Sequence, residues 1–205
     1  MVKNFNAHKY TVTDCTDEEF VGINITRDAD FYYYMDQTRM ITEIIKEAKL
    51  TGAIQAPYQI GNDTISEADS ATEEQKPECS KYPYCRVVGQ LMYGMVHTMI
   101  AIMYALNVLS RYGNNPGTRH IESLKHLLKY CKYSKMDRLI DTMTKILQLR
   151  FHCDADLGGN LDNGHSQTSY IGYLSKSVIC WCSTDQGSVS TSTADSEIKA
   201  VNHTL

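Results

Sequence analysis

Leu149-Arg-Phe-His-Cys-Asp154 decides the fold class, because its apolar and polar side chains alternate as they do in a half-buried strand. Gly158-Gly159 then marks a turn. Two more runs rich in aromatic and β-branched residues follow at Ser169–Leu174 and Val178–Cys182, and both read as strands. Ser192 can cap a last helix that runs to the end of the chain. The order strand, strand, strand, helix predicts a small sheet with one helix.

Three carboxylates stand out within this segment. Asp154 ends the first strand, Asp156 lies two residues on, and Glu197 lies in the first turns of the last helix. A strand-end Asp that meets a helix Glu can form an oxygen-rich Mg²⁺ site, and two such ions about 4 Å apart can assist phosphodiester cleavage. Acids at strand ends and in first helical turns are also common for local reasons. From the residues alone, the local explanation is favoured.

The first part of the chain predicts a β-hairpin followed by a helix. Phe20–Thr26 alternates from Val21 onward and reads as a strand, Arg27–Asp30 has turn composition, and Phe31–Met35 reads as the second strand. From about residue 36 to residue 49, apolar residues recur at steps of three and four, which is helical spacing.

The middle of the chain contains a polar segment and then an apolar one. Gly61–Lys81 carries six acids and few apolar residues, so we expect an exposed linker or mobile loop. Leu91–Leu109 is nearly all apolar and approaches the roughly 20 residues of a bilayer span. Because Gly94, His97 and Asn107 interrupt it, a buried core helix, broken in two, is the better prediction.

A basic amphipathic helix is predicted over about Pro116–Tyr133, with Asn115 as its N-cap. Its apolar face is followed by basic residues that are candidates for contact with a nucleic-acid backbone: Arg119, Lys125, Lys129 and Lys132. The net charge of −4 divides into −7 over residues 1–85, +6 over 86–147 and −3 over 148–205. Such a basic middle attracts phosphate, although charge alone favours a merely solvated helix face.

The amino-acid composition indicates the general class of protein. The 205 residues are 42% hydrophobic and 21% charged, which indicates a globular chain of one or two domains. The seven cysteines have irregular spacing and read as reduced thiols. No signal peptide is recognisable at the amino terminus, so a cytoplasmic or nuclear setting is expected.

Four motifs in the last third resemble the ribonuclease H domain of copia-type retrotransposon Pol polyproteins. They are Phe151-His-Cys-Asp-Ala-Asp-Leu-Gly-Gly-Asn-Leu-Asp162, Ser166-Gln-Thr-Ser-Tyr-Ile-Gly-Tyr173, Ile179-Cys-Trp-Cys-Ser183 and Ser192-Thr-Ala-Asp-Ser-Glu-Ile-Lys-Ala200. The resemblance implies that Asp154 and Glu197 are the first two Mg²⁺-binding catalytic acids, and that Asp156 is a neighbour rather than a ligand. The implied substrate is an RNA–DNA hybrid or a template–primer, with no membrane partner.

The upstream part resembles the end of the reverse transcriptase in the same family. The motifs are Phe20-Val-Gly-Ile-Asn-Ile25, Tyr84-Cys-Arg-Val-Val-Gly-Gln-Leu-Met-Tyr93, Leu109-Ser-Arg-Tyr-Gly-Asn-Asn-Pro-Gly-Thr-Arg-His120 and Leu124-Lys-His-Leu-Leu-Lys-Tyr-Cys-Lys132. The first is similar to a palm hairpin and the last to a basic helix of the thumb or connection.

The departures from the family pattern bear on activity. The polymerase Tyr-x-Asp-Asp pair and the later ribonuclease H acids are not found in this chain, and Leu157 stands where the family has Trp. We therefore predict an α+β chain that inherits the roles of RNA-directed DNA synthesis and hybrid cleavage but performs neither by itself.

The predicted parts are the end of the palm and start of the thumb (1–57), an acidic linker (58–84), thumb or connection helices (85–147) and a partial ribonuclease H-like sheet with one helix (148–205). The alternative is a non-catalytic nucleic-acid-binding remnant that uses the basic helix 116–133. The sequence does not predict an oligomeric state.

Overall fold

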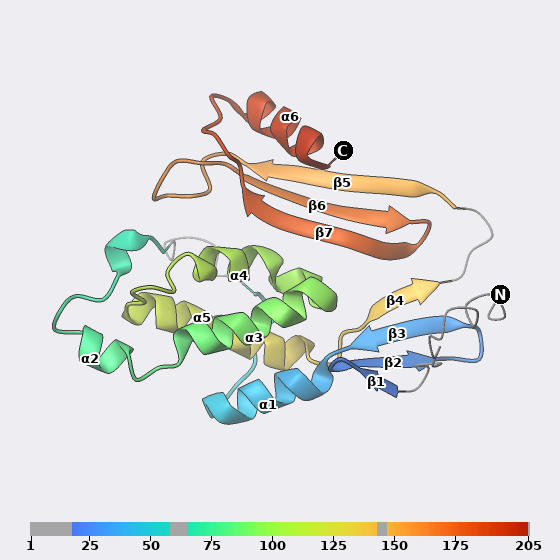
Figure 1. The fold of residues 1–205 in the computed structure, drawn as a ribbon, viewed down its shortest axis with the longest axis horizontal. Helices are drawn as coiled ribbons and strands as arrows, with labels where there is room; N and C mark the ends of the chain where they lie inside the picture. The colour runs from blue at the N-terminus through green and yellow to red at the C-terminus, as the bar shows by residue number, and fades with distance from the viewer. Residues whose placement is uncertain (1–17, 58–64, 143–146, 205) are drawn as a thin grey trace, which may run out of the picture.

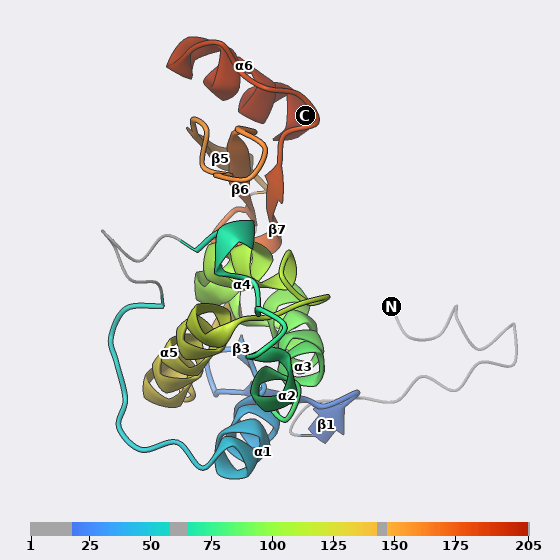
Figure 2. The ribbon, with the colours of Figure 1, turned by 90° about the vertical axis from the view of Figure 1, so that its left-hand side faces the viewer.

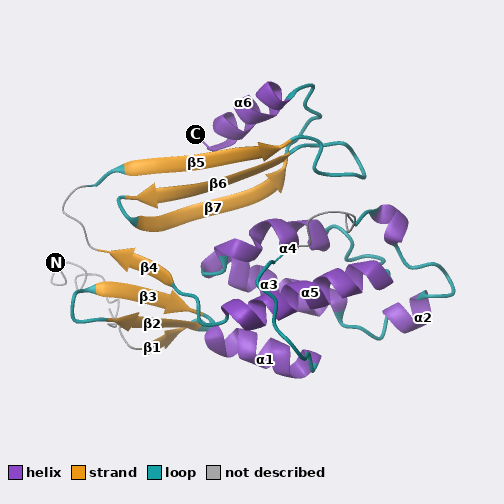
Figure 3. Ribbon diagram, turned by 180° about the vertical axis from the view of Figure 1, so that it is seen from behind, coloured by secondary structure: helices purple, strands orange, loops and turns teal. Residues whose placement is uncertain are grey.

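The computed structural model describes residues 18–57, 65–142 and 147–204, and it places two antiparallel sheets against a body of helices (Figure 1). A four-stranded sheet has the order β1-β2-β3-β4, and a three-stranded sheet has the order β5-β6-β7. The view from behind in Figure 3 shows the first sheet beside the helical body and the second sheet above it, with α6 beyond β5. The predicted α+β class is confirmed at the level of mixed helices and antiparallel sheets.

The first sheet contains the predicted hairpin, with one correction. Its strands are β1 (Glu18–Phe20), β2 (Ile23–Arg27), β3 (Tyr32–Asp36) and β4 (Leu139–Thr142). The predicted single strand Phe20–Thr26 is wrong, because Val21 and Gly22 form a tight turn with φ of 51° and 77°. Two consecutive positive φ angles are what a two-residue hairpin turn requires. The alternation of apolar and polar residues continues through this turn, so the sequence pattern did not indicate that the strand is interrupted.

The helical body consists of α1 (Thr38–Ala48), η2 (Glu67–Asp69), α2 (Lys76–Cys79), α3 (Tyr84–His97), η3 (Ile100–Ile102), α4 (Met103–Ser110) and α5 (Thr118–Ser134). The predicted break in the apolar stretch 91–109 is confirmed, since α3 ends at His97 and α4 begins at Met103. Leu91, Ile102 and Leu106 are fully buried there. In the parts of the chain that the structure describes, no helix is both long enough and apolar enough to cross a bilayer.

The prediction of an exposed linker over 61–81 needs correction for residues 65–81. Ile65, Ala71 and Cys79 are buried in the main core, and η2 and α2 lie within this segment. Arg119 of α5 pairs with Asp69 at 2.8 Å. Glu67, Glu73, Glu74 and Glu78 are exposed, whereas the few apolar residues anchor the segment to the core. A composition rich in acids therefore did not reveal that the segment packs against the core. Residues 61–64 of the predicted linker lie outside the described residues.

The start of α5 also differs from the prediction. Gly117, not Asn115, is the N-cap residue, and Pro116 lies before the helix. His120 Nδ1 accepts a hydrogen bond from the Gly117 N–H at 3.1 Å, so the imidazole supplies the cap. Asn115 Nδ2 instead donates to Ala71 O at 3.0 Å, which ties the helix entry to the 65–81 segment.

The second sheet follows the predicted order of three strands and a helix. β5 spans Leu149–Asp156, β6 Gln167–Leu174 and β7 Ser177–Asp185, with α6 at Thr193–Thr204. Ser192 Oγ accepts the Asp195 N–H at 3.2 Å, which confirms the predicted cap. Figure 2 shows this sheet nearly edge-on, with β7 toward α4 and α6 at the far end of the molecule. The six cysteines within the described residues are free thiols.

Candidate functional site

Asp154 and Asp156 lie on the same face of β5, because residues two apart on a strand share a face. Asp156 Oδ2 accepts a hydrogen bond from Tyr104 OH of α4 at 3.4 Å, so this face is turned toward the helical body. Asp156 Oδ2 would also lie only 2.4 Å from a Cβ added at Gly159. The Asp156 carboxylate thus lies between Tyr104 of α4 and the turn that follows β5. Both Asp154 and Asp156 are exposed to solvent.

Helix α6 covers the opposite face of the sheet. Gln186 Nε2 donates to Thr168 Oγ1 and to the α6 carbonyl Ser196 O, and the rings of Tyr170 and His203 lie 6.2 Å apart. Thr168 and Tyr170 stand directly opposite Ala155 and Cys153 of β5, so these residues define the α6 face. Glu197 is exposed on α6. The sheet therefore separates the face of Asp154 from the face that carries Glu197.

The magnesium site implied by the resemblance needs several converging oxygen ligands. Among residues 18–57, 65–142 and 147–204, no group of three or more His, Cys, Asp or Glu side chains is gathered closely enough to hold a metal ion. The described residues alone therefore do not fit a magnesium site. The ligand roles of Asp154 and Glu197 stay a prediction, and no chemical step is derived through the metal.

The basic residues of α5 differ in their surroundings. Arg119 pairs with Asp69, and Lys125 Nζ lies 5.3 Å from the centre of the Tyr82 ring. Lys132 Nζ donates to Leu50 O at 3.3 Å. Lys125, Lys129 and Lys132 form no ion pair with a carboxylate of the described residues. These three lysines lie at helical steps of four and three, so they form one stripe along α5.

The structure brings together a set of hydrogen-bonded residues that the sequence analysis missed, where α3 and the end of α4 meet the second sheet. Arg111 Nη2 donates to Asp185 Oδ1 at 2.5 Å and to Gln167 Oε1 at 2.7 Å. Asn107 Nδ2 donates to Ser183 O at 2.9 Å, and Trp181 Nε1 donates to Met95 O at 2.8 Å. We call these residues the docking seam: Met95, Asn107, Arg111, Gln167, Trp181, Ser183 and Asp185.

One signal in the sequence could have revealed the docking seam. Asn107 and Arg111 are four residues apart at the end of a nearly apolar stretch, so they lie on one side of a helix. Polar side chains on one stripe of a core helix need polar partners from another element. The partners, however, are 56 to 76 residues further along the chain, and nothing local identifies them.

A second polar contact, which is partly buried, lies beside the docking seam. Tyr112 OH donates to Asp162 Oδ2 at 2.9 Å, and the Tyr112 ring stacks on His120 with centroids 4.1 Å apart. His120 is fully buried. Its Nδ1 accepts from Gly117, so the proton is on Nε2, which donates to Ser66 O at 3.0 Å. Burial lowers the pKa of His120 below its ordinary value, although the Ser66 carbonyl and Asp69 oppose this shift.

We expect this histidine to make the fold sensitive to mild acid. The pKa of His120 is lower in the folded than in the unfolded chain, so unfolded molecules bind the proton first as the pH falls below about 6.5. Stability contributed by neutral His120 is therefore complete above that pH and decreases below it. Urea unfolding at pH 7.5 and pH 5.5 should show a lower midpoint at pH 5.5. A His120→Gln variant should lose most of this difference; an unchanged difference would contradict the assignment.

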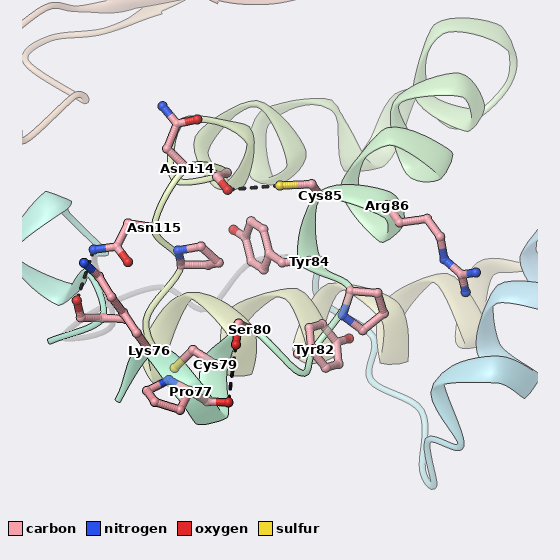
Figure 4. Close-up of a pocket in the computed structure, with 14 residues that line it drawn as sticks. Lys76, Pro77, Cys79, Ser80, Tyr82, Tyr84, Cys85, Arg86, Asn114 and Asn115 are labelled. Atoms are coloured by element: carbon pink, nitrogen blue, oxygen red, sulfur yellow. Dashed lines mark hydrogen bonds between the residues drawn. The ribbon is translucent and has the colours of Figure 1, made fainter. Parts of the chain in front are cut away.

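A cavity of about 630 Å³ lies between α2, the start of α3 and the loop 113–116 (Figure 4). Two of its polar side chains form hydrogen bonds within the chain, whereas the buried Tyr82 OH has no hydrogen-bond partner among the described residues. Cys85 Sγ donates to Gly113 O at 3.0 Å, and Ser80 Oγ donates to Pro77 O at 3.3 Å. No nucleophile–base pair is formed among the described residues that line it. The cavity therefore offers no catalytic arrangement, and it lies away from Asp154 and Glu197.

Comparison with known proteins gives a consistent family. The chain is 30% identical over 190 residues to the retrovirus-related Pol polyprotein from transposon TNT 1-94 of Nicotiana tabacum, a match that covers 91% of this chain and 14% of that protein. It is 32% identical over 121 residues to the Pol polyprotein from transposon RE1 of Arabidopsis thaliana, covering 59% of this chain and 8% of the relative. The chain thus spans a small part of the polyproteins it matches.

A third relative carries a different name. The secreted RxLR effector protein 161 of Plasmopara viticola is 30% identical over 120 residues, covering 58% of this chain and 84% of that protein. No protein-family model matches the chain, and no solved structure matches it. The two polyprotein matches agree with the motif resemblance along the chain. The chain belongs to the retrovirus-related Pol polyproteins of copia-type transposons.

Proposed function

We propose that this chain joins the end of a reverse transcriptase, within residues 1–147, to the first part of a ribonuclease H domain, within residues 148–205. The observation that carries the proposal is the arrangement of β5, β6, β7 and α6, with Asp154 on the first strand and Glu197 in the helix. This is the order of elements and acids that the motif resemblance implies. The match to a Pol polyprotein over 91% of the chain supports the same assignment.

The inherited role of such a segment is RNA-directed DNA synthesis and cleavage of RNA in an RNA–DNA hybrid, in the cytoplasm or nucleus. Mg²⁺ would supply the charge that assists phosphodiester hydrolysis in the whole enzyme. Because the described residues gather no metal site, we propose that this chain by itself binds hybrid without cleaving it.

The test is incubation of a labelled RNA–DNA hybrid with the chain and Mg²⁺ or Mn²⁺. We expect no cleavage above background, and the same result for Asp154→Asn, because Asp154 and Glu197 lie on different faces of the sheet. Folding of both proteins is checked by circular dichroism. Metal-dependent cleavage by the chain that Asp154→Asn abolishes would overturn the proposal and identify an active nuclease.

The binding surface we propose is the lysine stripe of α5, formed by Lys125, Lys129 and Lys132. The observation that favours it is that these lysines pair with no carboxylate of the described residues, whereas Arg119 is engaged by Asp69. Lysine side chains spaced along one helix face can contact successive phosphates, with an affinity that falls as salt rises. Such a surface would bind nucleic acid both in the whole polyprotein and in the second candidate function, a non-catalytic nucleic-acid-binding remnant.

A further inference from the structure

A segment of the chain runs alongside the lysine stripe of α5. Residues 50–57, which we call the strap, follow α1 and pass along the outer side of α5 (Figure 2). Lys132 Nζ donates to Leu50 O at 3.3 Å, the Ile54 N–H donates to Lys129 O at 3.3 Å, and His126 Nε2 lies 3.0 Å from Ala56 O. Increasing strap numbers meet decreasing α5 numbers, so the strap runs antiparallel to the helix.

The strap occupies hydrogen-bond donors on α5 that a phosphate backbone could also use. Because Ala56 O can only accept, His126 Nε2 is the donor in that contact. Two of the three contacts therefore place carbonyl oxygens on a lysine ammonium and an imidazole N–H. A phosphate oxygen would accept from the same donors, and charge-assisted hydrogen bonds are about twice as strong as bonds to a neutral acceptor. A nucleic-acid backbone bound along α5 would therefore compete with the strap for the same donors.

The strap is held weakly. Its residues 51, 52, 53, 55 and 56 are exposed, and only Leu50, Ile54 and Pro57 are half-buried. It contains no acidic residue that could pair with the lysines. From His126 to Lys132 the helix rises roughly 9 Å, whereas six residues from Leu50 to Ala56 could span about 20 Å when extended. The strap therefore has slack, and segments with few buried contacts open at low free-energy cost.

We propose that the strap is a displaceable cover on the lysine stripe, and that a nucleic-acid duplex binds α5 by replacing the strap carbonyls with phosphate oxygens. This inference rests on the proposed hybrid-binding function and adds its regulation. A site that is open only part of the time binds with an affinity reduced by the open fraction. Loosening the strap therefore strengthens binding, although the strap residues themselves contribute no contact to the duplex.

The most direct test is hydrogen exchange of the full chain, with and without a short RNA–DNA hybrid. The proposal predicts that the hybrid slows exchange or leaves it slow in α5 but accelerates exchange over residues 50–57, where the Ile54 N–H loses Lys129 O. Acceleration on binding is the opposite of what a directly contacted segment shows. Slower exchange over 50–57 would mean that the strap is part of the binding surface, and unchanged exchange would mean that it does not move; either overturns the proposal.

A matched pair of proline variants tests the effect on affinity. Ile54→Pro removes the N–H that donates to Lys129 O, and it should tighten hybrid binding about 2- to 10-fold, the equivalent of one neutral hydrogen bond. Gln55→Pro is the control, because it adds the same ring one residue further along the chain. Gln55 is exposed and takes part in no hydrogen bond among the described residues, so the hybrid affinity of this variant should change less. Equal affinities for wild type and Ile54→Pro overturn the strap and leave hybrid binding standing. Absence of binding by all three proteins at low salt overturns both.

Discussion

A Gly117→Ala variant should lose about 3 kcal/mol or more of unfolding free energy, the upper part of the range for overpacked sites. A Cβ at this position would lie 1.9 Å from Asp69 O and 3.0 Å from Ala71 N. Both are backbone atoms, so no side-chain rotation can relieve the contact. The φ of −90° is open to any residue, and the requirement for glycine arises only from this close approach.

The cost should extend beyond the clash itself. Displacing residues 69–71 from Gly117 would also strain the pair between Arg119 and Asp69 and the bond from Asn115 to Ala71 O. Burial alone would raise the pKa of Asp69, but the Ser66 N–H and Arg119 hold it below its ordinary value. The measurement is urea unfolding followed by circular dichroism at pH 7.

Gly89→Ala is the matched control for this variant. Gly89 is in the interior of α3, is exposed, and has nothing within 4 Å of an added Cβ. Alanine is the better helix former, so Gly89→Ala should gain roughly 0.5–1 kcal/mol. A Gly117→Ala protein as stable as wild type would mean that residues 65–81 do not pack against the start of α5 as described.

The second large effect is expected for Arg111→Met in the docking seam. Removing the guanidinium leaves the carboxylate of Asp185 and the amide oxygen of Gln167 without their donor. The Arg111 and Asp185 side chains are 17% and 28% exposed, so the pair is largely buried. Breaking a buried pair costs about 3–5 kcal/mol. Because Asn160 Nδ2 still donates to Asp185 and water can reach the carboxylate, we expect about 2 kcal/mol.

The location of the effect distinguishes this prediction from general destabilisation. Hydrogen exchange should rise in β6, β7 and α6 more than in α1 and α5, since the seam connects the second sheet to α4. Arg86→Met is the control, because it removes the ion pair with Glu47 in which the two side chains are 58% and 54% exposed. It should change the free energy of unfolding by about 0–1 kcal/mol. Equal effects of the two variants would contradict a buried docking seam.

Local patterns predicted most of the secondary structure. Alternation identified β2 and β5, and runs rich in aromatic and β-branched residues identified β3, β6 and β7. The recurrence of Ile41 and Ile44 identified the buried face of α1. The apolar side of α5 was also predicted, since Leu124, Leu127 and Leu128 are fully buried. These features depend on periodicity within a few turns or strand residues, and this information is carried by the chain itself.

Features that depend on distant partners were not predicted. β4 has no strong pattern of its own, and its four residues pair with β3 more than 100 residues earlier in the chain. The cap at Gly117 depends on His120 and on the approach of residues 69–71. The burial of Ile65 and Ala71 could not be inferred from a segment dominated by acids. In each case a tertiary contact outweighed local composition.

The candidate site divides in the same way. The sequence placed Asp154 on a strand and Glu197 in a helix, as the structure does. It could not determine that α6 covers the face opposite Asp154, because this depends on how the helix returns over the sheet. Likewise the basic composition of α5 was evident, whereas the strap that runs alongside it was not.

Binding of a labelled RNA–DNA hybrid across a series of salt concentrations tests the central claim most directly. We predict that the chain binds the hybrid and that its affinity falls as salt rises, with a log–log slope of roughly 0.9 for each phosphate contacted. A variant with Lys125, Lys129 and Lys132 all changed to Gln should bind more weakly and with a smaller slope. No binding at the lowest salt, or the same slope in the triple variant, would contradict a nucleic-acid-binding role for α5.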